Sequence, residues 1–442
     1  MPGLAMRRFL SLSTIVFGAR LAGAGVGFAA QILLARLVPA ETLGIFFLAT
    51  SVAAVLGIVA AAGYPNVTVR FVSRYRERGR FGVLAAYARQ TQRDTLRNAV
   101  LVMIAVAGFA LVYPAADAET RLAIACGALA IPAAVSIRVN GTFAIAARQF
   151  QASWLPDFLG RPVLFLVAII GLALMGLHLS AVLVVATMAA ATTVVAVAQY
   201  LWIRPHLPRG EARHDRRLGR LWRATSRPLV IVALFTALFA DLDLTILGSL
   251  LPAHELAVFG ACLKVAFLVD FATQLVQSFA APDIADGYTR RERGVTERAI
   301  AQANLLSVAA TLLALSGAAV GGRLILSAFG PDFVAGHAAL VVLVAAQVLR
   351  AGFGPTLQLM TMVGAQRQIA AVFALAAVVL VLANLLLAPN FGPVGAAAAV
   401  LITVLFWTGA LALLLYRRTG LRTDAVASLA ALRSGTAAPQ AG

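Results

Sequence analysis

Twelve apolar runs, most of them about 20 residues long, follow one another along almost the whole 442-residue chain. A helix of about 20 apolar residues is long enough to cross the ~30 Å hydrocarbon core of a bilayer. Hydrophobic residues make up 61% of the sequence and charged residues only 12%, which leaves no stretch for a separate soluble domain. We therefore predict an all-α, polytopic membrane protein of about twelve transmembrane helices, near 10–35, 43–69, 98–113, 121–147, 162–178, 180–203, 228–250, 255–281, 300–322, 334–363, 369–388 and 394–416.

The two halves of the chain resemble each other. Residues 38–46 and 251–259 carry Pro, Ala, Leu and Phe at identical spacing, 213 positions apart, and each stretch is followed by an Arg-Glu-Arg-Gly motif. With six spans, an even number, each copy has the same orientation across the bilayer. We predict two pseudo-symmetric six-helix lobes, 1–210 and 211–423, and a disordered tail at 424–442, which is rich in Ala, Ser, Gly and Pro.

The net charge of +18 comes mainly from arginines that cluster between predicted spans. Because Lys and Arg are biased toward cytoplasmic loops, the clusters at 70–97 and 204–227 predict a bacterial cytoplasmic (inner) membrane protein with both termini in the cytoplasm. No folded basic domain accompanies these arginines, so we predict contact with membrane lipids and no nucleic acid.

Several kinds of chemistry are disfavoured by the sequence. Lys264 is the single lysine and lies in an apolar run, so the phosphate-binding G-x-x-x-x-G-K-[ST] loop of ATP-driven motors is missing. The five histidines are scattered without metal-ligand spacing, and the outer loops are too short for a catalytic site. We expect no metal, no cofactor and no enzymatic activity.

Seven ionisable residues fall inside the predicted spans. Each costs about 2.5–3.5 kcal/mol at the centre of a helix, so such groups usually face one another or a watery cavity. Two explanations of these charges stay open. They form interhelical ion pairs, such as Asp243 with Lys264, or they serve a function. Asp241 and Asp243 are two residues apart on a helix and point about 200° away from each other, so at most one faces a given cavity. The seven residues are Arg20, Arg138, Asp241, Asp243, Lys264, Asp270 and Arg350.

Small residues and prolines predict where helices touch and bend. Gly23 and Gly27 have the spacing that permits close contact between membrane helices. Pro132 and Pro355 are expected to bend the fourth and tenth spans, although not at matching depths.

Three segments carry recognisable motifs. Residues 243–264 contain an Asp five before a Gly, a short Pro-containing turn, an aromatic residue and then a basic residue. Residues 138–150 run from Arg138 through the end of the fourth span to Phe150, and residues 364–367 form a Gly-Ala-Gln-Arg turn after the tenth span. These segments resemble the corresponding parts of the polysaccharide flippases of the multidrug, oligosaccharidyl-lipid and polysaccharide exporter superfamily.

The resemblance implies two six-helix lobes that form a V around a central cavity and move a lipid-linked oligosaccharide to the outer leaflet by alternating access. It also implies that four cations, Arg20, Arg138, Lys264 and Arg350, hold an isoprenoid diphosphate, with Asp241, Asp243 and Asp270 as charge partners or ion-coupling groups. Polysaccharide-assembly proteins are expected partners. Two alternatives stay open: an ion-coupled drug or metabolite antiporter of the same fold, and a non-transporting membrane scaffold for glycan synthesis.

Overall fold

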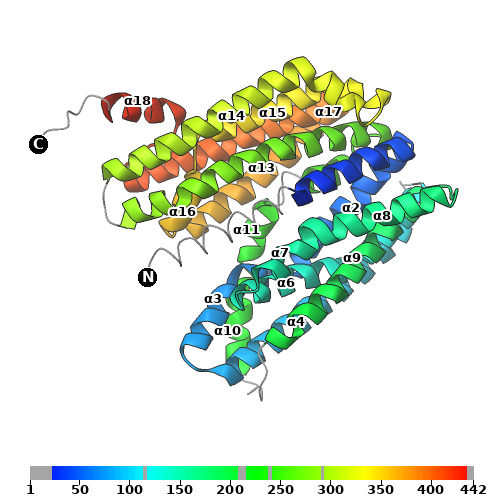
Figure 1. The fold of residues 1–442 in the computed structure, drawn as a ribbon, viewed down its shortest axis with the longest axis horizontal. Helices are drawn as coiled ribbons and strands as arrows, with labels where there is room; N and C mark the ends of the chain where they lie inside the picture. The colour runs from blue at the N-terminus through cyan, green and yellow to red at the C-terminus, as the bar shows by residue number, and fades with distance from the viewer. Residues whose placement is uncertain (1–21, 113–116, 208–215, 237–240, 290–292, 436–442) are drawn as a thin grey trace, which may run out of the picture. The chain divides into compact units, whose positions relative to one another are not determined.

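The computed structural model describes residues 22–112, 117–207, 216–236, 241–289 and 293–435, and the regular elements of this part are all helices (Figure 1). The chain divides into two compact units, Met1–Ala237 and Leu238–Gly442. Each unit is described by itself.

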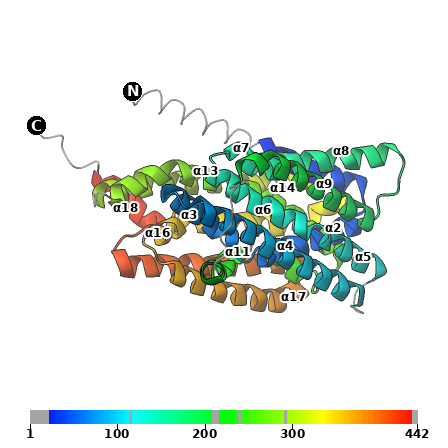
Figure 2. The same cartoon turned by 90° about the horizontal axis from the view of Figure 1, so that it is seen from below.

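The first unit begins with the apolar helix Ala22–Leu37. Helices α3, α4 and α6 pack against one another, as both Figure 1 and Figure 2 show. The elements after Leu37 are α2 (Ala40–Ala60), α3 (Tyr64–Glu77), α4 (Phe81–Val112), α5 (Ala118–Ala128), α6 (Ile131–Ala146), α7 (Phe150–Leu155), the π-helical turn η1 (Pro156–Gly160), α8 (Arg161–Leu174), α9 (Ala181–Ile203), the 3-10 turn η2 (Arg204–His206), α10 (Arg216–Ser226) and α11 (Leu229–Thr236).

The second unit is also helical where it is described, and α13, α14, α15 and α17 form its packed centre. Its elements are α12 (Asp243–Leu247), α13 (Ala253–Thr289), α14 (Arg293–Ser327), the 3-10 turn η4 (Pro331–Gly336), α15 (His337–Gly352), α16 (Thr356–Met362), α17 (Gln366–Thr419) and α18 (Ala425–Gly435).

The prediction of about twelve membrane helices is confirmed. Nine helical segments of the described chain are long and apolar enough to cross a membrane, and Ala22–Leu37 is a shorter apolar helix. The longest segment, α17, contains two predicted spans, because Gly392 has non-helical angles (φ 56°, ψ −137°) between Pro389 and Pro393. The remaining span, predicted at 228–250, corresponds to α11 and α12, which lie on either side of residues outside the description.

Prolines interrupt both spans in which bends are expected. Pro132 stands in the first turn of α6, directly after the break that separates α5 from α6. In the tenth span, Gly354 takes a positive φ of 67° and Pro355 precedes α16. Because proline has no N–H and fixes its own φ, it is tolerated at the start of a helix but not in its interior.

Helix Ala22–Leu37 approaches the π-helical turn closely through its glycines. A Cβ atom at Gly23 would collide with the carbonyl of Phe158, and one at Gly27 would lie 3.9 Å from Cγ of Pro162. The close contact that the spacing predicts is confirmed at Gly23, while Gly27 lies at an ordinary contact distance.

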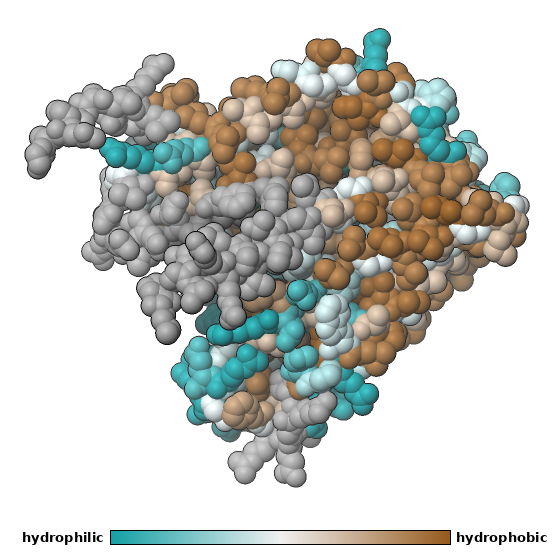
Figure 3. Space-filling model, in the orientation of Figure 1, coloured by the Kyte–Doolittle hydropathy of each residue, from teal (hydrophilic) through white to brown (hydrophobic). Residues whose placement is uncertain are grey.

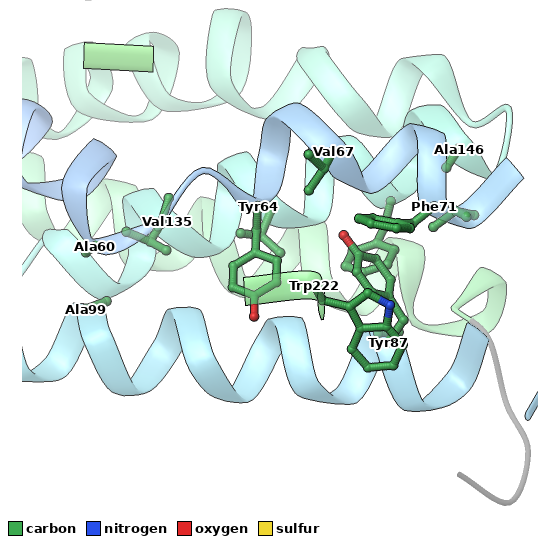
Figure 4. Packing of buried hydrophobic residues seen from close by; sticks show 14 of the residues in the cluster. Ala60, Tyr64, Val67, Phe71, Tyr87, Ala99, Val135, Ala146 and Trp222 are labelled. Carbon is green, nitrogen blue, oxygen red and sulfur yellow. The ribbon is translucent and has the colours of Figure 1, made fainter. Parts of the chain in front are cut away.

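An aromatic cluster holds α10 against α3 and α4 in the first unit (Figure 4). Trp222 is 2% exposed, and its ring packs edge-on against Tyr87 with centroids 5.2 Å apart. The indole Nε1 of Trp222 donates a hydrogen bond of 2.9 Å to the hydroxyl of Tyr75. Burial of a large aromatic side chain with its polar atom satisfied stabilises the attachment of α10.

The surface matches a membrane protein with polar helix ends. On the face shown in Figure 3, hydrophobic residues cover the region of α8 and α9, and hydrophilic residues gather where α3 and α10 lie. Exposed leucines, valines and phenylalanines along these helices would be costly in water but are the expected lipid-facing side chains.

Two details differ from the sequence-based organisation. The first unit extends to Ala237 and therefore includes α10 and α11, which we assigned to the second lobe. The predicted disordered tail contains the helix α18, so disorder is wrong for Ala425–Gly435, while 436–442 lie outside the described residues. An alanine-rich composition, which we interpreted as low complexity, is equally favourable for a helix that has a partner to pack on.

Candidate functional site

A small cavity of about 90 Å³ lies in the first unit, among α2, α5, α6, η1, α8 and α9. Most of its wall is made of small residues, which leave room around two cations and one acid. The lining residues are Thr50, Ala53, Ala54, Gly57, Gly127, Ala130, Ala134, Arg138, Asp157, Arg161, Val185, Met188, Ala189 and Thr192.

Arg138 reaches this cavity from the middle of α6. Ala130, Ala134 and Arg138 follow one another at intervals of four residues, so they lie on one face of the helix, and all three line the cavity. The side chain of Arg138 is exposed, and no hydrogen bond or ion pair joins it to any other described residue. A guanidinium carries five N–H donors in a planar fork, so Arg138 is available to an anionic ligand.

A π-helical turn places the second cation. Pro156 cannot donate a backbone hydrogen bond, and the turn that starts there closes with the backbone N–H of Arg161 bonded to the carbonyl of Pro156, five residues earlier. Arg161 is then paired with Asp157 across one turn, Nη2 to Oδ1 at 3.0 Å, with both side chains about one-third exposed. Turns of this kind are frequent at functional sites.

The position of Arg161 differs from the prediction, in which the fifth span begins at residue 162 and leaves Arg161 outside it. The helical segment of the fifth span begins at Phe150 instead of residue 162, so Arg161 lies within it. Polar residues interrupt the apolar pattern before residue 162 and concealed this beginning, because a hydropathy pattern detects apolar residues and not helices. They are Gln149, Gln151, Ser153, Asp157 and Arg161. The pair Asp157 and Arg161, four apart, was the available signal.

In the second unit, Asp243 is fully buried at the start of α12. The side chain of Asn384 on α17 donates a hydrogen bond from Nδ2 to Oδ1 of Asp243 at 2.7 Å. Asn384 is a neutral partner that the sequence analysis missed, since it had considered Lys264. Asp241 is only partly buried, in keeping with the opposite directions that their spacing predicts.

Arg350 and Asp270 form an ion pair between α15 and α13. Their side chains are 21% and 14% exposed, and Gln274 donates a second hydrogen bond to Asp270, Nε2 to Oδ2 at 2.7 Å. A desolvated pair with a further hydrogen bond satisfies both charges. Arg350 thus has a protein counter-ion, whereas Arg138 faces the cavity of the first unit.

The remaining candidates are distributed as follows. Lys264 is half-buried in α13, and Asp241 precedes α12 in the same unit. Arg20 lies outside the described residues. Among the described residues, no group of three or more His, Cys, Asp and Glu side chains could hold a metal ion.

The fold defines the class of protein: a multi-pass membrane protein of the same architecture as flippases and transporters of known structure. It is similar to the lipid II flippase MurJ in an inward closed conformation, with a TM-score of 0.74, 11% sequence identity, and coverage of 97% of this chain and 94% of that chain. An inward-facing multidrug resistance MATE family transporter of the MOP superfamily gives a TM-score of 0.72 at 15% identity, covering 95% and 99%. A MOP superfamily transporter from Pyrococcus furiosus gives 0.56 at 14%, covering 91% and 94%.

The sequence itself matches the polysaccharide biosynthesis protein family over residues 11–271, more than half of the chain, and the protein belongs to that family. A search of curated proteins found no match. The family resemblance inferred from residues 138–150 and 243–264 is therefore confirmed, and so is the predicted fold class.

Proposed function

We propose that this protein is a flippase that moves an isoprenoid-diphosphate-linked oligosaccharide across the bacterial cytoplasmic membrane by alternating access, for export of a surface polysaccharide. The observation that carries the proposal is the exposed guanidinium of Arg138, without a protein partner among the described residues, in the middle of a helix that otherwise reads as membrane-spanning. A cation in such a position is costly unless it serves a polar ligand. The diphosphate of a lipid carrier is a ligand of matching charge.

Membership of the polysaccharide biosynthesis family and the fold shared with the lipid II flippase MurJ support the same substrate class. The proposal assigns Arg20, Arg138, Lys264 and Arg350 to the diphosphate. The binding energy would come from charge-assisted hydrogen bonds in a site of low dielectric, where they are about twice as strong as neutral ones. The sugar would be selected by other contacts.

A translocation assay in vesicles tests the proposal. The purified protein is reconstituted with a fluorescent lipid-linked oligosaccharide, and its appearance on the far side is followed by a sugar-modifying enzyme added there. We expect Arg138→Ala and Lys264→Ala to abolish translocation while the protein stays in the membrane. Arg204→Ala, at the end of α9, is the control and should be near wild type. Wild-type protein that fails to move the lipid in these vesicles would contradict the flippase and leave the antiporter and the scaffold.

A second candidate function, an ion-coupled drug or metabolite antiporter, is favoured by the buried carboxyl of Asp243. Its Oδ2 atom has no hydrogen-bond partner among the described residues, so it offers a position for a proton or a small cation. The vesicle assay separates the two functions. Antiport requires that transport of an amphipathic cation depends on an imposed proton or sodium gradient and disappears in Asp243→Asn, whereas the flippase moves the lipid-linked sugar.

A further inference from the structure

The cavity of the first unit, about 90 Å³ in volume, has room for a small charged group. The cations of its lining are Arg138 and Arg161, and the one acid is Asp157. A tetrahedral phosphoryl group has few heavy atoms and several strong acceptors, which two guanidinium forks can bind.

The two arginines differ in their partners. Arg138 is bound to no described residue, while Arg161 already has Asp157 as a partner at 3.0 Å. An anion that enters the cavity can therefore bind Arg138 directly but must compete with the Asp157 carboxylate for Arg161. Because all three groups line one cavity, the competition takes place at short range.

We propose that Arg138 and Arg161 form a binding site for one phosphoryl group of a diphosphate, and that Asp157 is an internal competitor which limits its affinity and speeds its release. The inference rests on the proposed function for the source of the diphosphate, but the site is defined by its own residues. A transporter must release its substrate as well as bind it, and a carboxylate one helical turn from the cation provides a replacement partner when the anion leaves.

Several features of the fold hold the competitor in place. The π-helical turn ends in a main-chain bond to the nitrogen of Arg161, and the backbone of Gly23 packs on the carbonyl of Phe158 in the same turn. Asp157 and Arg161 are thus carried by a supported segment of backbone, whereas Arg138 belongs to a separate helix, α6. The distance between the cations is therefore set by helix packing and not by a loop.

Binding is measured on the full-length protein in lipid nanodiscs by calorimetric titration, with inorganic pyrophosphate as one probe and farnesyl diphosphate as the other. We expect saturable binding of both. Arg138→Gln and Arg161→Gln should each weaken it by about tenfold or more, as the loss of a charge-assisted hydrogen bond implies. Arg204→Gln, outside the cavity, should bind like wild type. Pyrophosphate affinity equal to that of farnesyl diphosphate assigns the recognition to phosphate alone, and tighter farnesyl diphosphate binding shows that the lipid adds to it.

The competitor role has its own signature. Asp157→Asn should tighten the binding of pyrophosphate several-fold, and this gain should vanish in Asp157→Asn/Arg161→Gln, because the competition acts only through Arg161. Arg161→Lys keeps the charge without the planar fork and should recover part of the affinity. Weaker binding in Asp157→Asn would overturn the competition, and binding that ignores both Arg138→Gln and Arg161→Gln would overturn the site.

The outcome is independent of the vesicle assay. If pyrophosphate binding depends on the two arginines but no lipid-linked sugar is translocated, the anion site stands and the flippase fails. If the protein translocates the lipid-linked sugar but its binding of pyrophosphate does not depend on the two arginines, the flippase is supported and this site is refuted.

Discussion

Asn384 donates the hydrogen bond of 2.7 Å that fixes the carboxyl of Asp243, and both side chains are fully buried. The bond satisfies Oδ1 of Asp243 and Nδ2 of Asn384. Oδ2 of Asp243 and Oδ1 of Asn384 have no hydrogen-bond partner among the described residues. A buried polar atom without a hydrogen-bond partner lowers the stability of the folded protein. The two unpartnered oxygens of Asp243 and Asn384 therefore indicate a functional role and not a stabilising one.

The two members of this pair should respond differently to substitution. Asp243→Asn preserves the shape of the side chain and removes a buried charge whose hydrogen-bond partner, Asn384, is neutral. The variant should therefore be as stable as the wild type or more stable. Asn384→Ala leaves the carboxyl without its donor and should lower the free energy of unfolding by about 1–3 kcal/mol. Thermal unfolding in detergent measures both. Equal stability of Asn384→Ala and wild type would contradict the assignment of the bond.

The ion pair of Arg350 with Asp270 predicts a non-additive pattern of stability. Removing one partner leaves an uncompensated charge in a poorly solvated place, so Arg350→Met and Asp270→Leu should each cost about 3–5 kcal/mol. The double variant, which replaces both charges by apolar groups, should be more stable than either single one. Chemical unfolding of the four proteins completes the cycle.

The same arginine is a candidate ligand of the diphosphate, and transport distinguishes the two roles. If Arg138 and Arg350 contact one anion, the losses of translocation in Arg138→Ala and Arg350→Ala should be non-additive in the double variant. Fully additive losses would show that the two arginines share no ligand and would leave Arg350 as the structural partner of Asp270.

The number and type of the helices were predictable, because hydrophobic length is a direct requirement of the bilayer. Pro39 and Pro252, equivalent in the sequence repeat, both stand immediately before a long helix, α2 and α13. Where polar residues occur at the end of a helix, hydrophobic length does not predict the position of that end. The segment from Phe150 to Arg161 is helical although Gln151, Ser153, Asp157 and Arg161 interrupt its apolar residues.

The site was predictable only in part. Charge inside a span singled out Arg138 and Asp243 without any structure, because an ionisable group in hydrocarbon needs a reason. Their neighbours were missed for a physical cause: Asn384 lies 141 positions from Asp243, and no local spacing reports a contact over that distance. Likewise, pairing with Asp270 gives Arg350 an environment different from that of Arg138, which lies 212 positions earlier in the chain, close to the 213 of the sequence repeat.

Topology can be tested with reporters of location. The bias of arginines predicts that fusions after Arg80, Arg217 and Arg293 report the cytoplasm. Fusions after Ala118, Pro252 and Pro331, at the opposite ends of the intervening spans, should report the outside. A cytoplasmic signal at Pro252 would contradict the duplication with equal orientation of both halves.

Asp424 caps α18 and makes the attachment of this helix dependent on pH. Its carboxyl accepts hydrogen bonds from the backbone N–H of Ala427 at 2.9 Å and from Nε of Arg422 at 3.0 Å. Burial alone would raise the pKa of Asp424, but the bonds to Arg422 and Ala427 outweigh it and hold the pKa below its ordinary value of 3.8. A depressed pKa in the folded state means that the stabilisation is present above 3.8 and is lost as the pH falls through the folded pKa.

Hydrogen exchange of α18, corrected for the intrinsic effect of pH, measures this loss. Protection of Ala425–Gly435 should fall at acid pH in the wild type, and in Asp424→Asn the protection should be weaker at neutral pH and nearly independent of pH. The helix is also tied to α14, where Asn304 donates from Nδ2 to the carbonyl of Thr423 at 2.6 Å. Asn304→Ala should therefore expose α18 at every pH, which separates the anchor from the cap.

The attachment of α10 gives a last prediction, because one hydrogen bond and one large ring can be removed separately. Trp222→Phe and Tyr75→Phe each delete the 2.9 Å bond between Nε1 and the hydroxyl, and each should cost about 1 kcal/mol, with little further loss in the double variant. Trp222→Ala also empties the space between Tyr75 and Tyr87 and should cost about 3–5 kcal/mol. Leu221→Ala, at a side chain that is 52% exposed on the same helix, is the control and should change stability by less than about 0.5 kcal/mol. Unfolding in detergent measures all five variants, and a Trp222→Ala protein as stable as Leu221→Ala would show that the aromatic cluster does not hold α10 in place.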